Sequence, residues 1–346
     1  MDPPARVSET GAILLGNLVE VDGFAERPFR VITHIHSDHV LGFSKSKKHA
    51  TFIVGTPATL EALEVLGMKV PPDKALPLQY GEPVKLIDET LVLQESKHVL
   101  GSCQVLLETS SGERVGYTSD FKFPGTKIMK GLDVLVIDAT YGDTHMRRPF
   151  KHEIPQLFAD LVLDELSRGV PVRVLGFHGK LQEAMEVLRT HGVDAPFIMP
   201  RKIYEFTKIS VKYGMKIKDF YLEGTRKAAE IIRDGWYVLF HHVNSHRNPS
   251  VKITDIYLTG WMFDEPIKVL NNSFRRKAFA VGFSDHGDFD DTLAYVEEAR
   301  PKILVVDGYR ASIHVAMKFA REVEKRIGVK TIVMPRKEKG IRVFED

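Results

Sequence analysis

The feature that most constrains this chain is a cluster of metal-binding residue types directly after an apolar run. His34, His36, Asp38 and His39 fall within six residues. The preceding residues 29–33 are mostly apolar and β-branched, which predicts a buried strand that delivers all four side chains to the loop at its end. Two imidazoles spaced i, i+2 can converge on one cation, and Asp38 and His39 then face a second position. Imidazole with carboxylate suits zinc, and two metals a few ångströms apart suit hydrolysis.

Two later segments extend this pattern. His98 lies in residues 96–102, before a small-residue turn, and Asp120 ends residues 117–120. With the first cluster they resemble, in order, the metal motifs of the metallo-β-lactamase fold. The resemblance implies two divalent ions, zinc at the first position and zinc, manganese or magnesium at the second. The ligands it implies are His34, His36 and His98 for one ion, Asp38 and His39 for the other, and Asp120 between them.

A second set of motifs narrows the family. Asp138 precedes a Thr-Tyr pair, His286 lies in residues 282–288, and residues 179–183 read Gly-Lys-Leu-Gln-Glu. These segments resemble the extra motifs of the β-CASP nucleases, the nucleic-acid-processing branch of the same fold. The resemblance covers nearly the whole chain. It implies an α/β fold, a four-layer αββα sandwich interrupted by an inserted α/β domain. The expected ranges are 1–144 for the first part, 145–275 for the insert and 276–346 for the second part.

The residue patterns agree with this organisation. The first 140 residues alternate short apolar strands with turns, and the middle alternates strands with helical spacing, which predicts a parallel sheet. The apolar residues 278–283 predict that the first domain's strand pattern resumes after Arg275. Another strand is predicted over residues 302–306.

The position of Asp307 departs from the family. Many β-CASP nucleases have a metal-binding histidine in this turn, and the DNA cross-link-repair branch has an apolar residue. Here Asp307 follows Val305-Val306. Three interpretations are open: Asp307 is a further metal ligand, it orients a histidine that is one, or it has no role at the metal.

His286 and Asp138 are predicted to complete the catalytic group with Asp38 and Asp120. A phosphodiester's leaving oxygen needs a proton, and His286, oriented by Asp138, is the candidate acid. Zinc ligation by His286 is the competing interpretation.

Other residues indicate the substrate. Thr259-Gly260-Trp261 resembles a turn of the DNA cross-link-repair nucleases and ligase-associated exonucleases. Trp261 either stacks on a base or packs in a core. Lys180, at a helix start, is a candidate for binding a terminal phosphate, with Ser284 and Thr259 as weaker candidates.

Composition sets broader limits. The 346 residues are 43% hydrophobic and 27% charged, which is typical of a soluble globular protein. The one cysteine, Cys103, excludes an internal disulfide and fits a reducing compartment. No apolar run approaches the roughly 20 residues of a membrane span, and no signal peptide is evident, so we expect a cytoplasmic protein without a membrane partner. Residues 145–275 have a basic excess, which either suits a polyanionic substrate or is ordinary scatter of charge along the chain.

The function expected from these features is a metal-dependent nuclease, a 5′-to-3′ DNA exonuclease with a role in DNA repair. Nucleic acid is the expected partner, with DNA favoured over RNA. An RNA-processing nuclease of the same fold is the first alternative. A small-molecule hydrolase and a non-catalytic nucleic-acid-binding module are further alternatives. The sequence leaves the oligomeric state open.

Overall fold

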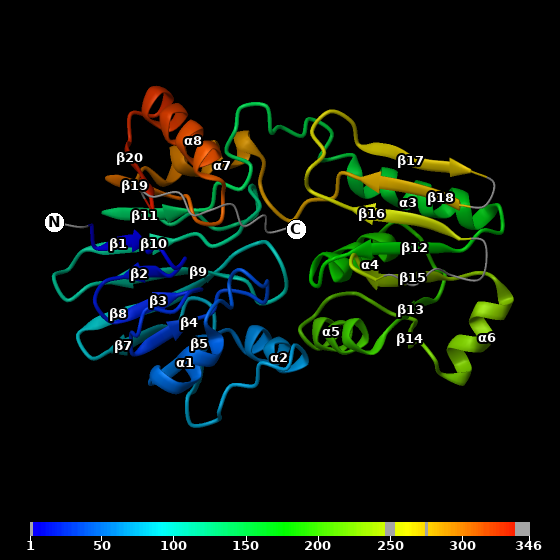
Figure 1. Ribbon diagram of the computed structural model, residues 1–346, viewed down its shortest axis with the longest axis horizontal. Helices are drawn as coiled ribbons and strands as arrows, with labels where there is room; N and C mark the ends of the chain where they lie inside the picture. Colours follow the sequence, from blue (N-terminus) through cyan, green and yellow to red (C-terminus); the bar gives the residue numbers. More distant parts are fainter. Residues whose placement is uncertain (1–2, 246–252, 274–275, 336–346) are drawn as a thin grey trace. The chain divides into compact units, whose positions relative to one another are not determined.

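The computed structural model describes residues 3–245, 253–273 and 276–335. The chain forms two compact units (Figure 1), one of Met1–Arg147 with Asp285–Asp346 and one of Arg148–Ser284. Among the described residues, no helix is both long and apolar enough to cross a membrane.

Two β-sheets are found in the part of the first unit that the structure describes. In its described part, one sheet has six strands in the order β1 to β6, and the other has seven in the order β20-β19-β11-β10-β9-β8-β7. The six-stranded sheet comprises β1 (Ala5–Val7), β2 (Ile13–Leu15), β3 (Val19–Val21), β4 (Phe29–Val31), β5 (Phe52–Gly55) and β6 (Ala75–Pro77). The seven-stranded sheet comprises β7 (Pro83–Leu86), β8 (Glu89–Glu95), β9 (Cys103–Glu108), β10 (Arg114–Tyr117), β11 (Val134–Ile137), β19 (Ile303–Asp307) and β20 (Lys330–Met334). The helices of this unit are α1 (Phe43–His49), α2 (Pro57–Val65), α7 (Phe289–Ala299) and α8 (Ile313–Arg326).

Alternation along β11 shows how the layers form. Successive side chains of a strand point to opposite faces. Val134 and Val136 belong to the core shared by the two sheets, whereas Leu135 and Ile137 belong to the core under α7 and α8. Figure 1 shows α7 and α8 beside β19 and β20, and α1 near β4 and β5. The unit is therefore the four-layer αββα sandwich that was predicted.

Three strands of the second sheet bring carboxylates to one edge. β10, β11 and β19 pair in parallel, so their carboxyl ends meet at the same edge of the sheet. Asp120 and Asp138 follow β10 and β11, and Asp307 ends β19. Residues far apart in the sequence are thus gathered by sheet topology alone.

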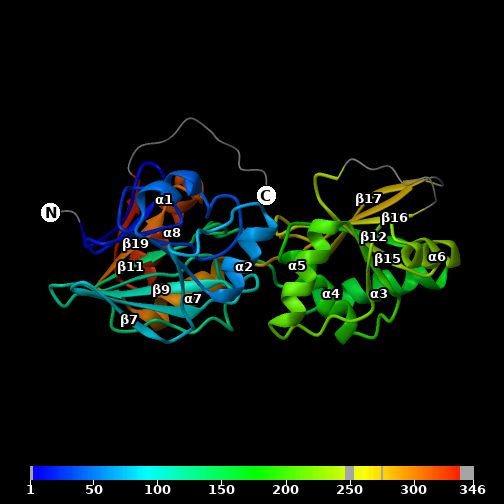
Figure 2. The same ribbon diagram turned by 90° about the horizontal axis from the view of Figure 1, so that it is seen from below.

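The described residues of the second unit form one sheet with helices on both faces. Its described strand order is β14-β13-β15-β12-β16-β18-β17, parallel throughout except for β17 against β18. Figure 2 shows α3 and α4 along one face of this sheet, and α6 packs against Ile198 and Leu239 on the other. The strands are β12 (Val172–Gly176), β13 (Phe197–Met199), β14 (Phe220–Leu222), β15 (Val238–His242), β16 (Thr254–Leu258), β17 (Ile267–Ser273) and β18 (Arg276–Val281). The helices are α3 (Ile154–Ser167), α4 (Lys180–Thr190), α5 (Arg201–Lys212) and α6 (Arg226–Asp234).

The structure moves both predicted domain boundaries. The second unit begins at Arg148 rather than residue 145, and it ends at Ser284 rather than residue 275. The later boundary differs because β18 pairs in parallel with β16 and antiparallel with β17. The apolar residues 278–283 were assigned to the first domain, and this assignment is wrong because hydrophobicity does not reveal which sheet a strand joins.

Candidate metal centre

Three imidazoles and one carboxylate from three segments of the chain form the centre of the site. One ligand atom from each of His34, His36, His98 and Asp120 lies within 4.8 Å of the others. His34 Nε2 is 3.4 Å and His98 Nε2 is 3.5 Å from Asp120 Oδ2, and His98 Nε2 is 3.1 Å from His36 Nδ1. Three imidazoles and a carboxylate gathered in this way suit a zinc-type ion.

Burial makes these imidazoles good metal ligands. Burial lowers the pKa of His34 well below its ordinary value and the pKa of His98 to about 3, so both rings are neutral with an available lone pair. In the described part of the chain, Nε2 of His34 and Nε2 of His39 are buried without a hydrogen-bond partner. Such atoms are costly unless a ligand satisfies them, so the residues fit a bound metal.

His39 and Asp38 face a second position beside the first. His39 Nε2 is 3.3 Å from Asp38 Oδ2 and 3.2 Å from Asp120 Oδ1. Burial opposes a charge on His39, but Asp120, Asp38 and Asp22 outweigh it and raise its pKa well above the ordinary value. Positive charge is therefore stabilised where the sequence predicted a second cation. We call the point faced by Asp38 Oδ2, His39 Nε2 and Asp120 Oδ1 the second metal position.

Asp22 supports this site, and sequence analysis missed it. Its Oδ2 lies 2.7 Å from His39 Nδ1 and also accepts from Thr33 Oγ1 at 2.7 Å, while Oδ1 accepts from Thr33 N at 2.8 Å. Ser119 Oγ donates in turn to Thr33 Oγ1 at 2.7 Å. Asp22 and Ser119 both have positive φ, 57° and 54°, conformations that non-glycine residues adopt mainly where surrounding structure holds them. The available signal was a carboxylate directly after a short strand with a valine at each end.

His286 and Asp138 lie against the same cluster. His286 Nδ1 is 3.0 Å from Asp138 Oδ2, and Nε2 is 3.7 Å from Asp120 Oδ2. Asp138 Oδ1 accepts from Thr140 N at 2.8 Å and from Thr140 Oγ1 at 2.7 Å, which fixes the carboxylate. The ring of His286 therefore has one nitrogen held by Asp138 and the other facing the cluster. Ligand atoms of Asp120, Asp138 and His286 also lie within 4.8 Å, so both the acid and the ligand interpretations stay open.

His98 is oriented by a residue that the sequence did not single out. The backbone carbonyl of Asp285 accepts from His98 Nδ1 at 2.8 Å. This contact leaves His98 Nε2 to face His36 and Asp120. It also connects the turn that holds His286 to the first metal group.

Asp307 contacts Arg310 rather than the candidate ligands. Its Oδ2 accepts from Arg310 Nη1 at 2.8 Å, and its Oδ1 accepts from Tyr309 N at 2.8 Å and Arg310 N at 3.3 Å. Among the described residues, Asp307 belongs to none of the groups that could hold a metal. The ligand role of Asp307 therefore stays a prediction, and in the structure its carboxylate forms an ion pair with Arg310, three positions later.

The residues predicted to bind substrate all lie in the second unit. Lys180 is buried at the start of α4, with Nζ 5.9 Å from the centre of the Phe177 ring. Thr259 Oγ1 accepts from Trp261 N at 3.2 Å. Trp261 is 49% exposed, so the alternative of a core-packing indole is wrong. Ser284 is half-buried and is the last residue of the unit.

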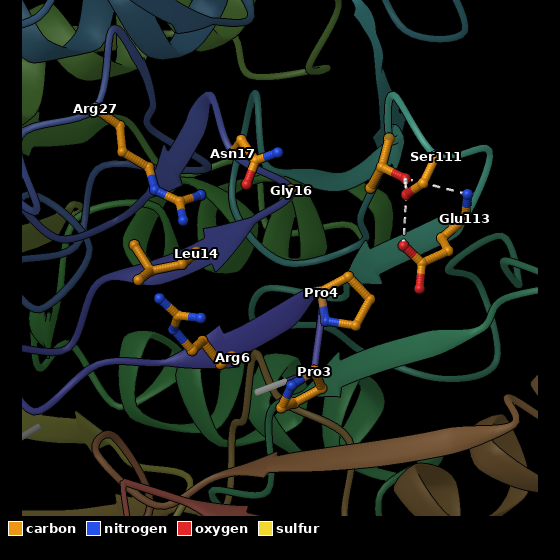
Figure 3. Close-up of a pocket in the computed structure, with 10 residues that line it drawn as sticks. Pro3, Pro4, Arg6, Leu14, Gly16, Asn17, Arg27, Ser111 and Glu113 are labelled. Atoms are coloured by element: carbon orange, nitrogen blue, oxygen red, sulfur yellow. Dashed lines mark hydrogen bonds between the residues drawn. The ribbon is translucent and has the colours of Figure 1, made fainter. Parts of the chain in front are cut away.

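A cavity of about 190 Å³ lies elsewhere in the first unit. Figure 3 shows Arg6, Arg27 and Asn17 lining it together with Ser111 and Glu113. Arg27 Nη1 already donates to the carbonyls of Leu15 and Val19, at 3.0 Å and 2.7 Å. None of the candidate metal ligands lines this cavity. The side chain of Arg27 connects β2 to β3 through these two hydrogen bonds.

Comparisons with known proteins place this geometry in a family. No family model matches the sequence. The chain is 48% identical over 140 residues to an uncharacterized protein in the lig 3′ region of Acidianus ambivalens, which covers 40% of the chain and 99% of that relative. It is 25% identical over 193 residues to a probable RNase MJ4 of Methanocaldococcus jannaschii, covering 52% of the chain and 44% of that relative. The chain belongs to the β-CASP group of metallo-β-lactamase-fold nucleases.

A further relative fits the ligase-associated branch of the β-CASP group. The chain is 24% identical over 312 residues to a probable DNA ligase of Opitutus terrae, covering 85% of the chain and 28% of that protein. The chain thus spans less than half the length of this relative and of the probable RNase. A protein of unknown function from Enterococcus faecalis V583 has a similar fold, with a TM-score of 0.58 and 13% identity over 90% of this chain and 80% of that one.

Proposed function

We propose that this β-CASP protein is a metal-dependent phosphodiesterase that degrades DNA from the 5′ end and acts in DNA repair. The observation that carries the proposal is the group of His34, His36, His98 and Asp120, of which all but the half-buried His36 are buried, with the His286–Asp138 pair against it. The relatives named for a ligase support DNA as the substrate.

The proposed metals are zinc at the first position and zinc, manganese or magnesium at the second. When bound, such ions lower the pKa of a coordinated water and offset charge on the phosphoryl oxygens. Neutral His34 and His98 supply lone pairs, and Asp120 supplies the charge that an ion in a buried site needs.

His286 is the proposed general acid of this reaction. Asp138 holds Nδ1, and Thr140 holds Asp138, so the ring is fixed with Nε2 toward the cluster. A proton on Nε2 would pass to the leaving oxygen when the phosphodiester bond breaks. Asp138 then stabilises the ring before and after transfer.

The residues proposed to bind DNA lie on the second unit. Trp261 offers an exposed indole face on which a base can stack. Lys180 lies at the start of α4, where backbone N–H groups also favour anions, and is proposed to bind a terminal phosphate with Thr259 and Ser284.

Digestion of 5′-labelled single-stranded DNA and RNA of the same sequence, side by side, tests this proposal. We expect labelled mononucleotides to appear first from DNA and the products to require added divalent metal after chelation. Release from RNA alone would overturn the DNA preference. Products of intermediate length without mononucleotides would overturn the exonuclease assignment.

RNA processing is the second candidate function, because one relative is named a probable RNase and another, 28% identical over 191 residues, a ribonuclease of Thermus thermophilus. The metal ligands proposed for DNA cleavage, His34, His36, His98 and Asp120, would also serve RNA cleavage. In the paired digestion this candidate predicts faster cleavage of RNA than of DNA.

A further inference from the structure

A buried arginine lies directly behind the second metal position. Arg310 follows β19, and its side chain is 4% exposed. Nη2 donates to the carbonyls of Asp38 and Gly11, each at 3.1 Å, and Nη1 donates to Asp307 at 2.8 Å. Three acceptors therefore fix the guanidinium in place.

Asp307 holds this arginine rather than a metal. Both of its oxygens are occupied, one by Arg310 Nη1 and the other by the backbone N–H groups of Tyr309 and Arg310. A buried guanidinium requires such a partner, because an unpaired charge in the interior is strongly destabilising. Asp307 and Arg310 therefore act as one unit.

The free side of the guanidinium faces a ligand. Arg310 Nε is 4.0 Å from Asp38 Oδ2, and this buried nitrogen has no hydrogen-bond partner in the described part of the chain. The positive charge of arginine is permanent at any physiological pH. Asp38 therefore carries a fixed cation beside the oxygen that would bind the second ion.

The donors at the second metal position are also less compact than those at the first. His39 Nε2 bridges Asp38 and Asp120, at 3.3 Å and 3.2 Å. Among the described residues, however, no group of three or more ligand atoms within 4.8 Å includes Asp38 or His39, whereas the first position has four.

We propose that Arg310, positioned by Asp307, lowers the affinity of the second metal position, so that the chain retains one divalent ion tightly and a second only weakly. The guanidinium repels an incoming cation and competes with it for Asp38. Like charges a few ångströms apart in a protein interior interact strongly enough to change affinity at least about tenfold. The proposal rests on the candidate ligand set but not on the reaction, since metal binding is measured without substrate.

Metal content of the full chain tests this proposal. The protein is stripped with a chelator, loaded with excess zinc, desalted and measured by mass spectrometry of the metal. Competition with a fluorescent zinc chelator gives both affinities. We expect one equivalent to be retained by the wild type. In Asp307→Asn with Arg310→Met, which removes both charges together, the second affinity should rise at least about tenfold.

The matched control is Asp255→Asn with Arg173→Met. This pair is also buried, with Arg173 Nε and Nη2 each bonded to Asp255, at 2.8 Å and 2.9 Å, and it lies in the second unit. We expect its metal affinities to equal those of the wild type. If the Asp307/Arg310 double variant does not fold, Arg310→Gln replaces it, because it removes the cation and keeps a donor for the Asp38 carbonyl.

The possible results distinguish a failure of the Arg310 proposal from a failure of the metal-centre assignment. Two equivalents held with equal affinity by the wild type would overturn the proposal and leave the centre intact. A folded variant whose second affinity equals that of the wild type would overturn it too. No retained zinc at all would overturn the centre and the proposal together.

Discussion

Asp22 orients the predicted metal ligand His39 through one hydrogen bond. It bonds Nδ1 of His39, and this bond fixes which way Nε2 points. We expect Asp22→Asn to weaken metal binding by about 10- to 100-fold, because the carboxylate accepts through both oxygens, from His39 and Thr33, whereas an amide has only one accepting oxygen and its NH2 would face a donor. Zinc titration against a chelator measures this. An unchanged affinity would show that His39 needs no orienting carboxylate.

Substitution of His286 distinguishes two roles for its Nε2, general acid and metal ligand. If it is the general acid, His286→Asn should slow DNA cleavage by about 10²- to 10⁴-fold and leave the zinc content as in the wild type. Cleavage assays and metal analysis of the same preparation provide both values. Loss of a metal equivalent in this variant would instead make His286 a ligand.

Among single residues, the sequence predicted those whose chemical role is visible from neighbouring positions in the chain. The His34–His39 cluster was recognisable because its metal-binding residues are contiguous in the sequence. Asp22 and Arg310 were not recognised, because each acts through a contact that only the fold creates. The same reason applies to Asp307: its residue type predicted a role at the metal, and the sequence did not reveal its ion pair with Arg310.

Within the second unit, one carboxylate ties α3 to two strands. Glu165 on α3 accepts from Thr254 Oγ1 of β16 and from Lys277 Nζ of β18, each at 2.6 Å. Burial opposes ionisation, but the bonds from Lys277 and Thr254 outweigh it and lower the pKa of Glu165. Because the pKa of Glu165 is lower in the folded protein than in the unfolded chain, its ionised form stabilises the fold at pH values above the unfolded-state pKa, near 4.5. This stabilisation is lost as the pH falls through the folded-state pKa.

We therefore expect Glu165→Gln to reduce the free energy of unfolding at pH 7 more than at pH 3.5. Urea unfolding at both pH values measures the difference. Asp164→Asn, at the neighbouring carboxylate that is 49% exposed and pairs with Arg168, is the control and should change little at either pH. If Glu165→Gln reduced the free energy of unfolding equally at both pH values, the stabilising role of the Glu165–Lys277 ion pair would be contradicted.

Strands were predictable as elements but not as members of a sheet. The apolar β-branched run at residues 302–306 located β19, which is buried on two faces. The run that became β18 looked the same, and only its pairing with β16 assigned it to the second unit. Pairing partners are long-range, so a hydrophobic pattern cannot determine them.

Across the whole molecule, metal chemistry and substrate contacts are assigned to different units. The candidate metal groups lie in the first unit, and Lys180 and Trp261 lie in the second. If Trp261 stacks on a base, Trp261→Ala should weaken binding of single-stranded DNA by about tenfold or more while the metal content stays constant. Fluorescence anisotropy with labelled DNA measures this.

Trp236 provides the control for that measurement, as an indole 41% exposed in the same unit. Trp236→Ala should leave DNA affinity near that of the wild type. Equal losses in the two variants would mean that neither indole is a specific stacking site.

Cleavage of 5′-labelled single-stranded DNA by His34→Ala with His36→Ala, compared with the wild type, tests the central claim most directly. His49→Ala with His191→Ala is the matched control, because neither histidine belongs to a candidate metal group. The metal-centre account predicts that the first variant loses cleavage together with bound metal and that the control retains both. Wild-type cleavage by the His34/His36 variant would contradict it.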